Sequence, residues 1–144
     1  MSIDIKIFDL EETEGGMKYR FRFSEGRSIV TGIERLAQLI SKSLLTTAGS
    51  DKWAQQWGGG LESLLPIMHD SQDIQASSGN KIMAAVYKVE QDIKNKQIGQ
   101  NLDDNEVLVS LEVLDLRLDD LNKVGLYLRI VTADKVGTNF TFEV

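Results

Sequence analysis

The chain lacks several features that would point to particular functions. It has no cysteine, one proline and one histidine, His69, so disulfides, thiolate metal sites and paired-histidine sites are excluded. No apolar run reaches the roughly 18 residues of a membrane span, and we expect no membrane segment. Acidic residues outnumber basic ones, 22 against 16. Because phosphate binding needs clustered lysine and arginine, nucleic acid is not an expected partner.

What is present is the composition of a globular domain. The 144 residues are 42% hydrophobic and 26% charged, which suits one domain, 1–144, with a real core. The opening MSIDIKIFDL has no basic-then-apolar pattern. We therefore expect no secretory leader, and synthesis in the cytoplasm.

The first 30 residues predict an N-terminal β-hairpin arm. Ile3, Ile5 and Ile7 alternate with polar residues, and Tyr19–Phe23 alternates in the same way after the acidic turn EETEGG. Period-two alternation is typical of half-buried strands. A mobile arm is the alternative, since a hairpin alone is marginally stable.

The helical part, 31–95, begins at Thr31 and Glu34, whose spacing matches a capping box. Apolar residues at helical spacing predict a first helix that stops at Gly49. The segment 70–79 is polar and turn-prone and predicts a loop. Helical periodicity therefore predicts three helices: the first up to Gly49, a second from Leu61 to about His69, and a third over Ile82–Ile93 with Asn80 or Ser78 as its cap.

The last part, 106–144, predicts a small, mainly antiparallel sheet with strands at 107–118, 124–132 and 138–144. The alternation slips at Val113–Leu114, which indicates a bulge. Because the sequence ends on a strand, we expect that strand to be an edge open to pairing. The fold class is α+β.

Few residues could carry chemistry. Gly58-Gly59-Gly60 precedes a predicted helix but matches no nucleotide-binding fingerprint, so a close backbone approach or positive φ is the better interpretation. The pairs Asp103-Asp104 and Asp119-Asp120 lack EF-hand spacing. Trp53 and Trp57 suit packing beneath the glycine turn or in a subunit interface. We expect no catalytic, cofactor-binding or metal-binding residues.

The run from Gly32 to Leu65 resembles the sheath-initiator family of contractile phage-tail baseplate wedges and related injection machines. Its members show a helix ending Leu-(Leu/Ile)-Thr-Thr, a glycine, and then an aromatic-Gly-(Ser/Cys/Gly)-x-Leu step. The matching residues here are Leu44, Leu45, Thr46, Thr47, Gly49, Trp57, Gly58, Gly59 and Leu61. The resemblance continues through the third helix into the strands 107–118 and 124–132. Where the family has Glu-Pro-Arg, this chain has Glu90-Gln91-Asp92, which keeps only the glutamate.

The resemblance implies a structural virion protein of the tail baseplate, present in six copies around the tube. It implies contacts with the tail sheath protein, other wedge subunits and tube or hub proteins. The sheath contact would be β-strand addition to the strands 124–132 and 138–144. The residues expected at these interfaces are Trp53, Trp57, Gly58, Gly59, Glu90, Leu126, Leu128, Ile130, Phe140, Phe142 and Val144.

Two alternatives stay open. One is a small adaptor or assembly chaperone outside the virion. The other is a glycan hydrolase that uses carboxylates such as Glu62 and Asp103. On the edge-strand hypothesis, deleting residues 138–144 should leave a folded monomer that cannot start sheath assembly.

Overall fold

The structure is a computed structural model with an α+β fold, as the sequence predicts. It describes residues 3–5, 8–13, 16–23, 29–46, 49–50, 52–53, 55–60, 74–118 and 124–143. The predicted helix 61–69 lies outside these residues. The elements are β1 (Ile3–Ile5), β2 (Phe8–Thr13), β3 (Gly16–Phe23), β4 (Ile29–Thr31), α1 (Gly32–Leu45), α3 (Ile74–Gln97), β5 (Leu108–Leu118), β6 (Val124–Thr132) and β7 (Gly137–Glu143).

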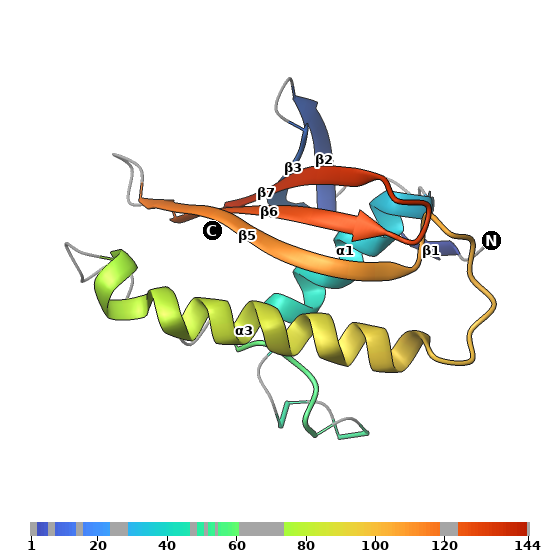
Figure 1. The fold of residues 1–144 in the computed structure, drawn as a ribbon, viewed down its shortest axis with the longest axis horizontal. Helices are drawn as coiled ribbons and strands as arrows, with labels where there is room; N and C mark the ends of the chain where they lie inside the picture. The colour runs from blue at the N-terminus through green and yellow to red at the C-terminus, as the bar shows by residue number, and fades with distance from the viewer. Residues whose placement is uncertain are drawn as a thin grey trace.

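Five strands form one mixed sheet in the order β2-β3-β7-β6-β5. The last three strands of the chain make an antiparallel meander. The N-terminal hairpin β2–β3 joins this meander through parallel pairing of β3 with β7, where Met17 lies opposite Phe140 and Tyr19 opposite Phe142. Figure 1 shows the hairpin projecting from the β7 side of the meander, away from α3.

This topology makes the expectation of an open C-terminal edge wrong. β7 lies between β3 and β6, so its backbone pairs on both sides within the same chain. The pairing joins segments more than 100 residues apart in the sequence, and local alternation carries no information about it. We therefore no longer expect a chain without residues 138–144 to fold, because that deletion removes a strand from the interior of the sheet.

The N-terminal hairpin is confirmed, but with different strands. β2 and β3 pair around the tight connection between Thr13 and Gly16. The first predicted strand contributes only Ile3–Ile5, which pairs with β4 in a separate two-stranded sheet. Residue Ile7 lies outside the described residues. The alternation therefore located β1 and β3, but β2 includes Glu11–Thr13 of the predicted turn, and the first strand pairs with β4 and not with β3.

The core lies between the helices and the meander. Figure 1 shows α3 running lengthwise beside β5, with α1 crossing at an angle. The apolar stripe of each helix and the facing side of the sheet pack into one hydrophobic cluster. Removing this apolar surface from water drives folding. The buried members of the cluster are Leu36, Ala37, Ile40, Leu44, Ile82, Val86, Val89, Ile93, Leu108, Leu111, Leu126, Leu128, Ile130 and Phe140.

The start of α1 is stabilised by a residue far away in the sequence. Thr31 is the N-cap but makes no side-chain capping bond, so the predicted capping box is wrong. Instead the buried carboxylate of Glu106 accepts a hydrogen bond from the Gly32 N–H at 3.2 Å, and another from the Asp103 N–H at 3.4 Å. A negative charge at a helix N-terminus satisfies free amides and complements the helix dipole.

Two further predictions about local structure have opposite outcomes. The ladder between β5 and β6 shifts register between Val113 and Asp115, so the bulge at the phase slip is confirmed. The predicted loop 70–79 is wrong over its second half, because α3 already begins at Ile74. Helix propagation adds a hydrogen bond per residue, which outweighs the turn preference of a few serines and one glycine.

Candidate interaction surface

Four of the expected interface residues belong to the protein's own core. Leu126, Leu128, Ile130 and Phe140 are all at most 1% exposed. They point to the helices because residues of one parity on β6 and β7 share a face. They cannot contact a partner in this fold, and their assignment to an interface is wrong. Phe142 pairs through its backbone with Leu126, and Val144 lies outside the described residues.

The glycine run bonds to the end of α1 and lies close to α3, where a Cβ on Gly59 would be 3.0 Å from a methyl group of Val89. The Gly59 N–H donates to the Ser43 carbonyl at 2.9 Å, and the Gly60 N–H donates to the Thr46 carbonyl at 3.0 Å. These bonds satisfy carbonyls at the helix end. A Cβ on Gly58 would lie 2.1 Å from the Thr46 oxygen, and Gly58 has φ +120°. The close approach expected of these glycines is confirmed.

The loop between α1 and the glycine run holds the two tryptophans in different environments. Trp57 packs against the core, with the Lys96 ammonium 4.9 Å from its ring centre. Trp53 is 89% exposed, and the Lys52 ammonium lies 5.3 Å from its ring centre. Trp57 therefore has the packing role. Trp53 remains a candidate contact residue, because such exposure of a large aromatic is characteristic of binding surfaces.

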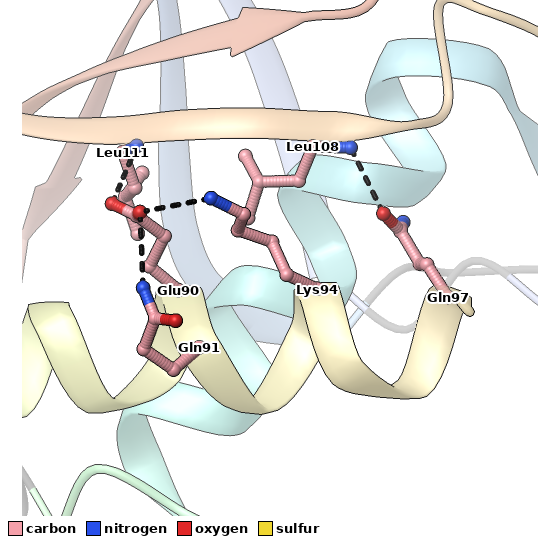
Figure 2. A network of polar contacts seen from close by, with 6 residues as sticks. All are labelled: Glu90, Gln91, Lys94, Gln97, Leu108 and Leu111. Carbon is pink, nitrogen blue, oxygen red and sulfur yellow. Dashed lines mark hydrogen bonds and ion pairs between the residues drawn. The ribbon is translucent and has the colours of Figure 1, made fainter.

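Glu90 of α3 bonds to a backbone amide on the outer edge of β5. Its carboxylate accepts a hydrogen bond from the Leu111 N–H at 3.0 Å, and the Lys94 ammonium lies 3.6 Å from its other oxygen. Gln97, the last residue of α3, accepts a hydrogen bond from the Leu108 N–H at 2.9 Å. Figure 2 shows these side chains rising from α3 to the strand. They occupy amides that an added strand would need.

The role of Glu90 bears directly on the sequence motif. In this chain the Glu90 carboxylate accepts a hydrogen bond from a strand amide. A proline or an arginine at the next two positions would supply no such acceptor, so this bond depends only on the glutamate, the one residue of the motif that is kept. The side chains of Gln97 and Glu106 also accept hydrogen bonds from backbone amides, and the sequence did not predict either role. Helical spacing places Gln97 seven residues after Glu90 on the same face, and this was the available signal for Gln97.

A groove lies farther along β5, between the bulge of that strand and the first part of α3. It has a volume of about 300 Å³, and its lining includes Ile82 and Met83 of α3 and Leu114 of the bulge. Met83 and Leu114 are half exposed. Asp115 also lines the groove, and the Arg117 guanidinium 2.5 Å away, followed by the Leu116 N–H, lowers the pKa of its carboxyl. The groove is thus mainly apolar, and the one carboxylate among its described lining residues is ion-paired with Arg117.

The described residues include few of the histidine and carboxylate candidates for chemistry. No group of three potential metal ligands occurs among them, and none of their helices is long and apolar enough to cross a membrane. Asp103 is exposed, and its N–H bonds to the buried Glu106 carboxylate, which also caps α1. His69, Glu62 and the pair Asp119-Asp120 lie outside the described residues.

Comparison with known proteins found no matching family model, no matching curated protein and no matching solved structure.

Replacing Gly58 with alanine is expected to destabilise the fold. The new methyl group would collide with the Thr46 carbonyl, and the positive φ disfavours any side chain. We expect a loss of about 1–3 kcal/mol in the free energy of unfolding. Urea denaturation measures it, with Gly99→Ala as control, since Gly99 also has positive φ but open space around it. Equal losses in both variants would show that the close approach contributes nothing.

Proposed function

We propose that this chain is a structural, non-enzymatic subunit of a contractile phage-tail baseplate and acts as a sheath initiator. Its partners would be the sheath protein and neighbouring wedge, tube or hub subunits, in the assembled virion. One observation carries the proposal: the meander β5–β6–β7 is extended by a hairpin from the distant N-terminus, through parallel pairing at β7. This intramolecular pairing between distant segments is the same kind of main-chain contact by which a strand from a partner would add to a sheet edge.

The sheath joint must differ from the one that the sequence suggested. β7 is occupied on both sides, and the first half of β5 is capped by Glu90 and Gln97. Within the described residues, β2 is the other outer strand of the five-stranded sheet. We assign the joint to β2, whose outward backbone groups would pair with an extended arm of a sheath subunit. Main-chain pairing supplies affinity at such an edge, and side-chain pockets set the register.

The first experiment tests the assignment to a tail. Contractile tails purified from cells that express a tagged copy are expected to contain this protein at the baseplate end, in six copies per tail. Quantitative mass spectrometry and labelling of the tag in electron micrographs measure both quantities. Its absence from intact tails would contradict the proposal and favour the adaptor or chaperone. Glycan cleavage abolished by one carboxylate substitution would favour the hydrolase.

The second experiment tests the joint. Consecutive amides of an edge strand point alternately to the partner strand and outward, so Leu10→Pro and Glu11→Pro remove one amide of each kind. The variant that loses the outward amide is expected to keep its melting temperature, since proline is tolerated on edges, and to stop initiating sheath assembly. Polymerisation of purified sheath protein on baseplates measures initiation. If the stable variant initiates normally, β2 is not the joint.

A disulfide between β3 and β7 provides the matched control. Lys18 and Thr141 are opposite residues of the parallel ladder, a separation within reach of a disulfide, and the chain has no other cysteine. The oxidised Lys18→Cys/Thr141→Cys variant cannot release the hairpin. We expect it to initiate sheath assembly at the normal rate. A loss of initiation on oxidation, reversed by reduction, would reassign the joint to β7.

A further inference from the structure

Gly16 lies at the point where the N-terminal hairpin meets the meander. It is the first residue of β3 and pairs with Thr13 across the hairpin. The next residue, Met17, starts the parallel ladder with β7 by pairing with Phe140. Continued by one step, the same register places Gly16 beside Asn139. One residue therefore belongs both to the closed end of the hairpin and to its contact with β7.

The contact at Gly16 leaves no room for a side chain. A Cβ at this position would lie 2.3 Å from the Asn139 carbonyl oxygen and 2.9 Å from its carbonyl carbon. Both atoms belong to the backbone of β7, and on the other side Asn139 pairs with Arg129 of β6, so a shift of this backbone would disturb that ladder. Gly16 also has φ +124°, a conformation that side chains disfavour. The two strands can meet in this way only at a glycine.

The ladder that follows Gly16 is short. Among the described residues, it extends along β3 only from Met17 to Tyr19, whereas β6 pairs with β7 from Gly125 to Val131. Parallel pairs are also slightly less stable per residue than antiparallel ones. A short parallel ladder is therefore sensitive to a poor fit at its first residue.

We propose that Gly16 is the positioning residue of the hairpin: its contact with Asn139 docks β2–β3 on β7 and thereby sets the place of the β2 edge. β2 joins the five-stranded sheet through β3, so a hairpin that is not docked carries the β2 edge away from the meander. The inference rests on the proposed function for the role of that edge as the sheath joint, and on the geometry alone for the docking. Gly16 acts through the backbone of β7 and not through contact with the sheath.

Two thiols measure the docking. Lys18→Cys and Thr141→Cys place them on opposite residues of the ladder, and equilibrium of the purified variant with dithiothreitol gives their effective concentration. Adding Gly16→Ala is expected to lower this concentration at least about tenfold, through strain and collision together. Two controls should leave it unchanged: Gly99→Ala, with φ +80° but open space around it, and Glu12→Ala, on the hairpin strand that does not pair with β7.

Amide hydrogen exchange separates docking from folding. In Gly16→Ala, the amides of α3 and of the ladder between β5 and β6 should keep their protection. The proposal is overturned if Gly16→Ala leaves the effective concentration of the thiols unchanged, if a control lowers it equally, or if α3 loses its protection as well. The last result would make Gly16 a residue of the whole fold.

Sheath initiation tests the consequence for the joint. Baseplates that carry Gly16→Ala with both thiols reduced are expected to initiate sheath polymerisation at least about tenfold more slowly than those with Gly16. Forming the disulfide in the same variant holds the hairpin against β7 and should restore the rate, which would not follow if the substitution only weakened the fold. A slow rate that the disulfide does not restore would contradict a positioning role. Normal initiation with an undocked hairpin would confirm the docking role and contradict the assignment of the joint to β2.

Discussion

Deletion of residues 138–144 is expected to abolish folding. β7 carries Phe140, which is 1% exposed, and it is the shared neighbour of β3 and β6. Without it, the hairpin β2–β3 has no strand to dock on and β6 loses its ladder on that side. The loss of one large buried side chain alone costs about 3–5 kcal/mol, which is comparable with the whole stability of many domains.

Circular dichroism and urea titration measure this effect. The truncated chain should show no cooperative unfolding transition, while Phe140→Ala should fold with the free energy of unfolding lowered by about 3–5 kcal/mol. Val136→Ala, on the exposed turn before β7, is the control and should change the free energy by at most about 0.5 kcal/mol. A truncated chain that unfolds cooperatively at the normal temperature would restore the idea of a dispensable final strand.

Replacing Glu106 with glutamine is the substitution expected to reveal the link between α1 and the loop before β5. Both carboxylate oxygens accept backbone N–H groups, from Gly32 and from Asp103. Glutamine keeps one acceptor and turns an NH₂ group toward the other donor, so a part-buried backbone amide loses its partner. We expect the free energy of unfolding to fall by about 1–3 kcal/mol.

Thermal unfolding and amide hydrogen exchange check this expectation separately. Glu106→Gln should melt several degrees lower than the natural protein, and the Gly32 amide should lose protection. Asp104→Asn is the matched control, because Asp104 is exposed and only two residues away. Unchanged melting in Glu106→Gln would mean that the carboxylate contributes nothing to the stability of α1. Reduced stability with full protection of Gly32 would place its effect elsewhere.

Two sets of residues on which the resemblance was based have a defined role in the structure. The positions Trp57, Gly58 and Gly59 serve to pack the end of α1 against α3 in this chain. Glu90 satisfies an amide of β5. Both roles are architectural within this chain, so these residues are not by themselves evidence of contacts with other subunits. The contact surface proposed above, the edge of β2, lies outside these residues.

The sequence alone determined the element types of the described chain over most of its length. Period-two alternation located β6 and the bulge in β5, and helical spacing identified the buried stripe of α3 from Ile82 to Ile93. These features depend on which side of a strand or helix meets the core, and that is a local property of the pattern. The close backbone approach at Gly58 followed from the same kind of reasoning.

Only the tertiary structure decided which surfaces stay open. The parallel pairing of β3 with β7, the capping of α1 by Glu106 and the covering of β5 by Gln97 each join residues that no local period connects. The last strand looked like a free edge because alternation reports the faces of a strand and says nothing about its neighbours in the sheet. Partner choice in a sheet is set by the whole chain, since only its packing determines which amides remain unpaired.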